Sequence, residues 1–213
     1  MTRFVPLLLL VLTCSVAFAA DETARGIWTA YDQPLNTDVT SSFWRGAVAT
    51  YMDSNPYGKP DPKYRSEIRT RSTQQNCISC SSAPYEDLYL KPNPNTSEET
   101  NDLWNWDVAE VFIGSDFQHI RRYKEFEMSP RGEWIDLDID LDKPHHEDGW
   151  KWNSGFEVSA RIAPTTHLWY GAMKIPYAAV DNHPAAPGNT LRITSFVAKV
   201  RHRPAIRSRG KRP

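Results

Sequence analysis

Residues 101–140 read NDLWNWDVAEVFIGSDFQHIRRYKEFEMSPRGEWIDLDID, and this stretch decides the fold. Its centre, residues 108–113, is an apolar run rich in β-branched residues, which is typical of a strand packed into a core. Glu110 stands inside that run, and a buried carboxylate is costly unless it is paired or hydrogen-bonded. Trp104 and Asp107 precede the run. Tryptophans beside a carboxylate at the mouth of a strand favour flat ligands that stack and hydrogen-bond, and sugars are the most evident class.

Period-two patterns continue along the chain. Residues 123–128 and 134–141 alternate in character and flank the turn signature Ser-Pro-Arg-Gly at 129–132, so they predict a β-hairpin. Further strands are predicted at 39–50, 63–73, 156–162, 169–175 and from 191 onward. Only residues 176–180 suggest a helical turn. The fold class that this pattern predicts is all-β, an antiparallel β-sandwich of two sheets with little helix.

The ends of the chain indicate export. An apolar run from residue 4 to 11, followed by Ala17-Phe18-Ala19, predicts a signal peptide over 1–20, because the run is too short to span a bilayer. We expect a secreted or periplasmic protein with one domain over 21–193 and a basic tail over 194–213. The formal net charge of −1 argues against a nucleic-acid partner, and no other segment predicts stable membrane insertion.

The mature chain keeps two cysteines, Cys77 and Cys80, in a CxxC spacing. In an exported protein, an exposed or oxidised pair is the plain interpretation. A thioredoxin-like motif needs a βαβ context, which the polar flanks do not provide. A zinc site would need two more ligands, and His145-His146 is the nearest candidate.

Four segments resemble the family 9 carbohydrate-binding modules, most closely their single-domain secreted bacterial relatives. They are 101–117, 121–140, GWKWNSGFEVSARI at 149–162 and WYGAMKIPYAAV at 169–180. The resemblance covers most of residues 32–193. It implies a β-sandwich of the immunoglobulin-like or DOMON-like jelly-roll kind that binds sugar chain ends or oligosaccharides without catalysis, in connection with polysaccharide degradation. It implies no defined cofactor beyond the structural calcium that is common in the family.

The resemblance also implies the ligand-binding residues. Trp104 matches the first of two clamping tryptophans, and Glu110 matches a carboxylate that hydrogen-bonds sugar hydroxyls. Asp107 occupies the acidic position between them and is expected to orient the loop. Glu127 takes the polar position on the next strand. An indole face stacks on the C–H face of a pyranose, while carboxylates accept strong hydrogen bonds from vicinal hydroxyls.

Two segments depart from the family pattern. Relatives carry Leu-Tyr-Phe-Leu-Phe where this chain has Cys-Ile-Ser-Cys-Ser at 77–81, and the latter can arise from the former by a one-base shift. The segment after Ile193 can likewise be a shifted version of the family's Asn-Leu-Phe-Arg-Ser-Glu-Gly. We therefore hypothesise frameshifts at both places, and a gene read that encodes Cys77 and Cys80 in frame would contradict the first. The chain would then lack the second clamping tryptophan and a closing strand, which exposes a sheet edge.

Other interpretations stay open. A DOMON-type haem or electron-transfer domain would use Met128 or a histidine as axial ligand, and a scaffold or adhesion domain would have lost sugar binding. Glu110 could instead pair with a basic residue at 121, 122 or 124. Asp residues at 136, 138, 140 and 142 resemble a calcium loop, but Leu141 replaces the required glycine, so their alternation predicts an acidic solvent-facing side of a strand. Glu125 and Glu127 share one strand face, so they cannot flank a glycosidic bond as a glycosidase pair would.

Overall fold

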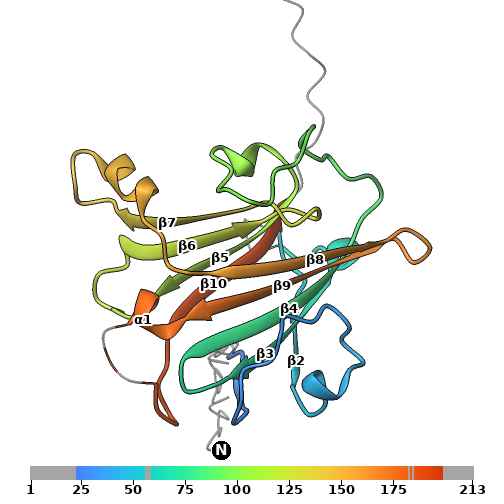
Figure 1. Ribbon diagram of the computed structural model, residues 1–213, viewed down its shortest axis with the longest axis horizontal. Helices are drawn as coiled ribbons and strands as arrows, with labels where there is room; N and C mark the ends of the chain where they lie inside the picture. Colours follow the sequence, from blue (N-terminus) through green and yellow to red (C-terminus); the bar gives the residue numbers. More distant parts are fainter. Residues whose placement is uncertain (1–22, 56–58, 182, 184, 199–213) are drawn as a thin grey trace, which may run out of the picture.

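The chain folds as a two-layered β-sandwich (Figure 1). The structure is a computed structural model that describes residues 23–55, 59–181, 183 and 185–198. The expected signal peptide at 1–20 and most of the basic tail, from residue 199 on, lie outside the described residues. The fold class predicted from the sequence is confirmed.

One layer is a six-stranded sheet in the order β1-β3-β4-β9-β8, with β2 paired to β3. Its strands are β1 (Ile27–Trp28), β2 (Ala49–Met52), β3 (Ser66–Ser72), β4 (Asn76–Pro84), β8 (Glu157–Ala163) and β9 (Leu168–Pro176). Every neighbouring pair is antiparallel except β1 and β3.

The other layer is a four-stranded antiparallel sheet in the order β10-β5-β6-β7. Its strands are β5 (Val108–Gly114), β6 (Arg122–Met128), β7 (Trp134–Asp140) and β10 (Arg192–Ala198). The helices are short: η1 (Ser42–Trp44), η2 (Pro62–Tyr64), η3 (Leu103–Asn105), η4 (His146–Lys151) and α1 (Tyr177–Val180). The predicted hairpin is therefore β6–β7, and the predicted helical turn is α1.

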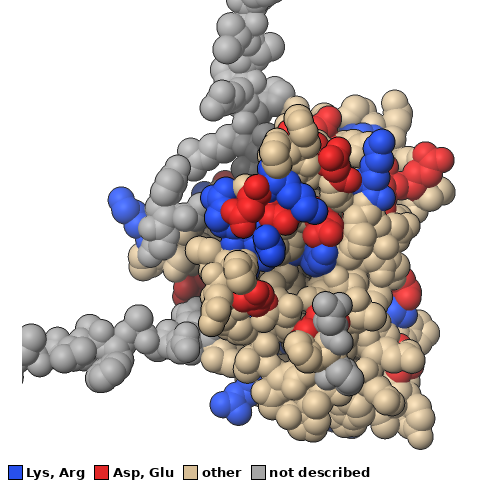
Figure 2. Space-filling view, turned by 90° about the vertical axis from the view of Figure 1, so that its left-hand side faces the viewer, with Lys and Arg blue, Asp and Glu red and all other residues tan. Residues whose placement is uncertain are grey.

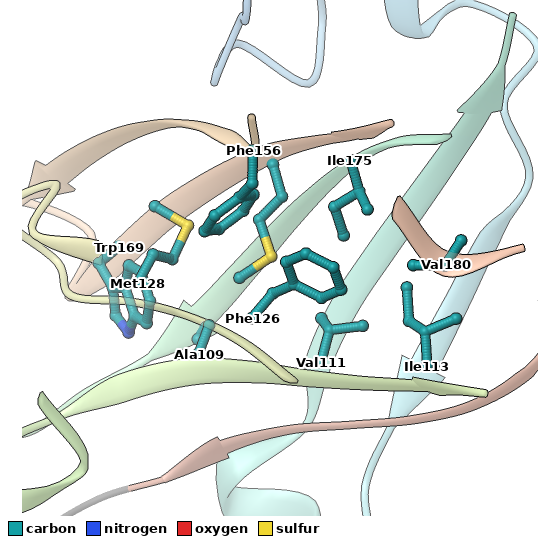
Figure 3. Close-up of a cluster of buried hydrophobic side chains, with 11 residues drawn as sticks. Ala109, Val111, Ile113, Phe126, Met128, Phe156, Trp169, Ile175 and Val180 are labelled. Carbon is teal, nitrogen blue, oxygen red and sulfur yellow. The ribbon is translucent and has the colours of Figure 1, made fainter. Parts of the chain in front are cut away.

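The main hydrophobic core lies between the two sheets (Figure 3). Val111 of β5 and Phe126 of β6 face Trp169 and Met173 of β9 across this layer, and all four are buried. Phe126 also meets Phe156 edge to face, with ring centroids 5.1 Å apart. Because alternate residues of a strand point to opposite faces, this inward set fixes which residues of β5 and β6 face outward.

The prediction of a strand over 39–50 is largely wrong, because only its last two residues belong to β2. Residues Ser42–Trp44 form η1, where Trp44 is buried and donates its indole N–H to the Asn36 carbonyl at 2.9 Å. Trp44 packs against Ile78 and Cys80 on the outer face of the six-stranded sheet. The apolar residues of this segment therefore cover a sheet rather than extend one.

The CxxC segment lies within β4, the strand between β3 and β9. Cys80 packs on the outer face with Ile78, while Cys77 is in register with Ile175 of the inter-sheet core, so the two thiols point to opposite faces. Both cysteines are free. Burial raises the pKa of Cys77 to about 11 and that of Cys80 to about 12, which keeps the thiols protonated and unreactive. The interpretation as an exposed or oxidised pair is therefore wrong.

The four-stranded sheet has a closing strand, contrary to the expectation from the sequence. β10 pairs with β5 from Arg192, opposite Gly114, to Ala198, opposite Val108. Val197 and Leu191 pack against the inter-sheet core. The strand therefore continues beyond Ile193, where the sequence placed the end of the domain.

Candidate functional site

The outer face of the four-stranded sheet carries three carboxylates on two adjacent strands. Glu110 of β5 stands directly opposite Glu127 of β6 in the strand register, and Glu125 lies two residues along β6 on the same face. Their carboxylate oxygens lie within 4.8 Å of one another. We call these three residues the carboxylate cluster. Among the described residues, it is the one group of three or more His, Cys, Asp or Glu side chains close enough to hold a metal ion together.

The cluster is strongly desolvated. Glu127 is 0% exposed and Glu110 is 6% exposed, whereas Glu125 is partly exposed. Burial, followed by the negative charge of Glu125, raises the pKa of Glu110 to about 8. Burial and then the charge of Glu110, with smaller contributions from Glu125, raise the pKa of Glu127 to about 10. Burial also raises the pKa of Glu125. Like charges in a low-dielectric site disfavour ionisation, so the three groups resist carrying three negative charges.

Glu127 differs from the other fully buried carboxylates. Glu133 accepts a hydrogen bond from the Ser129 hydroxyl at 2.8 Å, and Asp136 accepts one from the Ser154 backbone N–H at 2.7 Å. Within the part of the chain that the structure describes, Glu127 shares a side-chain hydrogen bond with Glu125, which raises the pKa of Glu127, and no other group donates to its carboxyl oxygens. A fully buried carboxylate without a donor costs folding free energy, so Glu127 needs an explanation.

Aromatic side chains lie over the same sheet face. η3 lies against β6, and Trp104 of η3 packs with Trp150 of η4 edge to face, with centroids 5.5 Å apart and planes at 70°. Both rings are partly buried on a cluster that includes Ile135 and Leu137 of β7. The carboxylate cluster and the two indoles therefore share one face of the molecule.

Asp107 has a structural position next to this face. It is 3% exposed, and its carboxylate accepts the backbone N–H of Tyr89 at 2.9 Å while its own N–H donates to the Tyr89 carbonyl at 2.9 Å. The Tyr89 ring stacks on Trp106, with centroids 4.6 Å apart. Asp107 thus ties the segment before η3 to the start of β5.

The alternative that Glu110 pairs with a basic residue at 121, 122 or 124 is wrong, because these residues pair with aspartates. Their ion pairs are Arg121–Asp142 at 2.7 Å, Arg122–Asp140 at 3.3 Å and Lys124–Asp138 at 2.5 Å. These pairs run along β6 and the end of β7, and Figure 2 shows basic and acidic side chains interspersed on that side of the molecule. The alternation of β6 directs Lys124 to the sheet face opposite Glu125.

The acidic side of β7 does not face solvent throughout. Asp136 is 0% exposed and is held by Ser154, whereas Asp138 and Asp140 are partly exposed and line a cavity of about 360 Å³ beside η4. The apolar residues of β7 instead face outward beneath η3 and η4. His145 and His146 line the same cavity, and Cys77 and Cys80 belong to the other sheet, so the suggested zinc set is not assembled.

Met128, the suggested axial haem ligand, lies in the inter-sheet core (Figure 3). Its side chain is 0% exposed and packs so closely on Gly171 that a Cβ added there would come within 2.8 Å of the Met128 sulfur. A haem could reach this sulfur only if the two sheets separated. Met128 is therefore a packing residue.

Of the four residues proposed from the sequence, the structure brings Glu110 and Glu127 together and places Trp104 over the same sheet face. Asp107 lies apart from the cluster and acts on the loop. Two further residues, Glu125 and Trp150, belong to this face. The period-two spacing of Glu125 and Glu127 already places them on one strand face, but the contact of Trp150 with Trp104 depends on the tertiary fold.

The fold is that of the family 9 carbohydrate-binding modules. The chain is similar to a family 9 module from Caldicellulosiruptor kristjanssonii, solved in complex with glucose (TM-score 0.51, 10% identity, 81% of this chain and 78% of that chain) and with cellotriose (TM-score 0.52, 10% identity, 82% and 77%). It is also similar to a carbohydrate-binding protein, described as putative, from Bacteroides uniformis (TM-score 0.60, 12% identity, 82% and 83%). These likenesses show the fold. No family model matches the sequence, and no curated protein is similar to it. Within the described residues, no helix combines the length and hydrophobicity that crossing a membrane requires.

Proposed function

We propose that this protein binds carbohydrate, without catalysing a reaction, on the outer face of the four-stranded sheet. The observation that carries the proposal is the partly buried Trp104 ring, which η3 holds against β6 on the face that bears the carboxylate cluster. Aromatic rings beside acceptor carboxylates suit sugars, which have apolar C–H faces and donor hydroxyls. The fold shared with modules solved in complex with glucose and cellotriose supports the same ligand class.

The candidate residues would take different parts in binding. Trp104 would stack on a pyranose ring, with Trp150 fixing its orientation through their edge-to-face contact. Glu125 is the most exposed member of the cluster and would accept hydrogen bonds from sugar hydroxyls. Glu110 would accept them through the small part of its side chain that is exposed. Glu127 is 0% exposed, so we assign it an indirect role, although the sequence suggested direct contact. Asp107 would hold the loop that carries Trp104.

Binding would take place outside the cytoplasm, on sugar chain ends or oligosaccharides, in connection with polysaccharide degradation. The expected signal peptide at 1–20 supports export, and sequencing the N-terminus of the mature protein tests it. We expect that terminus near residue 21. A mature protein that retains residue 1 would contradict export.

A glycan array probed with the full mature chain tests the ligand class. We expect binding to β-linked glucose oligosaccharides such as cellotriose and no turnover of the bound glycan. Circular dichroism on the same sample shows whether the protein is folded. A folded protein that binds no glycan would contradict the proposal and favour a scaffold or adhesion role.

A further inference from the structure

The hydrogen bond between the side chains of Glu125 and Glu127 needs a proton. Two ionised carboxylates have only acceptor oxygens, so a hydrogen bond between them requires one of the two to be protonated. The three carboxylates of the cluster also converge within 4.8 Å on one sheet face, where full ionisation would place three negative charges together. The cluster therefore holds a proton, and burial indicates which residue carries it.

Burial places this proton on Glu127. Its side chain is 0% exposed, whereas Glu125 is partly exposed, so ionisation costs more at Glu127 because water cannot solvate the charge. Glu127 also stands directly opposite Glu110 in the register of β5 and β6, so charges on both would repel across the strand pair. Burial, the charge of Glu110 and the hydrogen bond with Glu125 raise the pKa of Glu127 to about 10.

The positive charge on this sheet face lies away from Glu127. Arg192 of β10 is in register with Gly114, four residues along β5 from the strand partner of Glu127, which corresponds to about 13 Å. Its guanidinium donates to the carbonyls of Ile120 and Arg122 at 3.3 and 3.2 Å. Arg192 therefore neutralises the far end of the face and leaves the proton of Glu127 in place.

The other groups on the face are uncharged. Tyr123 of β6 points to the same side, and burial followed by the charge of Glu125 raises the pKa of its phenol, which keeps it protonated. The remaining residues around the cluster come from four elements: Thr194 of β10, Leu137 of β7, Trp104 of η3 and Trp150 of η4. These neighbours desolvate the cluster without supplying a counter-charge.

The charged residues of η4 have other partners or line the cavity beside it. His146 has its ring centroid 6.4 Å from that of Trp150, and its imidazole lies 3.9 Å from the carboxylate of Glu147. Asp148 and Lys151 line the cavity. η4 therefore adds no ion pair to the carboxylate cluster.

We propose that Glu127 stays protonated in the folded protein and donates its carboxyl proton to Glu125, which keeps Glu125 ionised and oriented as an acceptor for a sugar hydroxyl. This inference rests on the proposed carbohydrate site and gives the fully buried Glu127 a positioning role. Burial raises the pKa of Glu125, and the hydrogen bond with Glu127 opposes that rise. A hydrogen bond to a carboxylate is charge-assisted and stronger than a neutral one, so it fixes the orientation of Glu125.

Infrared difference spectroscopy of the full chain, without sugar, tests the proton. A protonated carboxylic acid has a carbonyl stretch separate from the carboxylate bands, and at pH 9 Glu110, whose pKa is about 8, has lost most of its proton. We expect wild type at pH 9 to keep an acid carbonyl band that Glu127→Gln lacks. Glu133→Gln, which changes a fully buried carboxylate with a Ser129 donor, is the matched control and should keep the band. Absence of the band in folded wild type, or its presence in Glu127→Gln, would overturn the proposal.

Titration with cellotriose tests the positioning role. The amide of Glu127→Gln still donates to Glu125, so this variant should bind within ~3-fold of wild type. Glu127→Leu suits a buried strand position but has no donor, so its affinity should fall at least ~10-fold. That loss should be greater at pH 6 than at pH 8, because Glu125 without its donor takes up a proton more readily.

Equal affinities of the three proteins, or equal losses in the two variants, would contradict the role of Glu127. The infrared measurement uses no sugar, so it decides the proton independently of carbohydrate binding. A folded wild type that shows the acid band but binds no cellotriose would contradict the proposed function and support the protonation of Glu127.

Discussion

Glu127 is the residue that departs most from ordinary strand chemistry. A strand interior normally buries apolar side chains or polar ones with partners, and the nearby buried acids Glu133 and Asp136 follow that rule through Ser129 and Ser154. Glu127 faces Glu110 across the strand pair instead. Directly opposed like charges destabilise a sheet, so this position costs stability unless a proton or a cation compensates.

The pH dependence of stability should reflect this cluster. In the unfolded chain, a glutamate titrates near its ordinary value of 4.5, whereas folding raises the pKa of Glu110 to about 8 and that of Glu127 to about 10. A raised folded pKa contributes stability that is complete below the unfolded pKa and is lost as pH rises through the folded value. The free energy of unfolding should therefore fall between pH 5 and pH 9 by on the order of a few kcal/mol.

Urea unfolding of wild type and Glu127→Gln across this pH range measures the effect. The variant should show a flatter profile and should be more stable than wild type at pH 9. Other titrating groups contribute equally to both proteins, so the difference isolates the cluster. Identical slopes for the two proteins would contradict the assignment.

Asp107 should matter for stability more than its place in a ligand-binding motif suggests. Asp107→Ala removes the buried carboxylate that accepts the Tyr89 backbone N–H at 2.9 Å. We expect a loss of about 2 kcal/mol in the free energy of unfolding, measured by chemical denaturation. Glu98→Ala, in the exposed loop before η3, is the control and should change stability little. If Asp107→Ala lowers the free energy of unfolding no more than Glu98→Ala does, Asp107 does not hold the loop.

At the scale of elements, β4 presents small polar side chains to the core. Ser79 is in register with Met173, and the inward residues of β9 belong to the inter-sheet core, so a hydroxyl occupies a position where apolar residues are favoured. The family pattern that the sequence resembles has an apolar strand at this position, and the frameshift hypothesis rests on that difference.

Ser79→Val should therefore stabilise the protein by about 0.5–1 kcal/mol, because a β-branched side chain gains burial and fits a strand. Differential scanning calorimetry should show a higher Tm for this variant and no change for Ser97→Val in the exposed loop. A lower Tm for Ser79→Val would mean that the core beside β4 has no room for two methyl groups.

Elements with a regular alternation were predictable from the sequence, and those defined by tertiary contacts were not. Residues 123–128 and 134–141 gave the β6–β7 hairpin because alternation and a turn signature coincide. The strand predicted over residues 39–50 was largely wrong, because Trp44 and its apolar neighbours cover the outer face of the six-stranded sheet and do not pair with a strand. In β7 the alternation predicted a strand correctly, but it did not show which face is covered. The face that carries Ile135 points away from the other sheet and is buried by η3 and η4.

At the scale of the whole molecule, β10 joins the end of the described chain to its centre. Its seven residues pair with β5, the strand that carries Glu110, and Val197 packs on the core. Without β10, β5 would become an edge strand of the four-stranded sheet, and one row of its backbone N–H and C=O groups would lose its strand partner.

Two truncated chains, one ending after Ala198 and one after Ile193, test where the folded domain ends. A chain that ends after Ala198 should unfold at nearly the same Tm as the full chain. A chain that ends after Ile193 loses most of β10, so it should lose more than about 3 kcal/mol of stability or fail to fold. Thermal unfolding monitored by circular dichroism measures both. Equal stability of the two truncated chains would show that the domain ends at Ile193.

The site itself was only partly predictable. The spacing of Trp104 and Glu110 predicted that both side chains lie on one face, because a short loop leads from Trp104 into the strand that carries Glu110. Glu125 required the register of β5 and β6, which fixes the carboxylate distances, and Trp150 required the packing of η4 on β7. Burial of Glu127 could not be foreseen, since it depends on what covers the sheet.

Isothermal titration of cellotriose into the full mature chain, its Trp104→Ala variant and its Trp28→Ala variant tests carbohydrate binding most directly. Trp28 is the matched control, because it is 55% exposed on β1 of the other sheet. We predict saturable binding by wild type and Trp28→Ala and at least a tenfold weaker affinity for Trp104→Ala, since loss of one stacking ring costs more than about 1.4 kcal/mol. Equal binding by all three folded proteins, or binding lost with Trp28 and kept without Trp104, would contradict the proposed site.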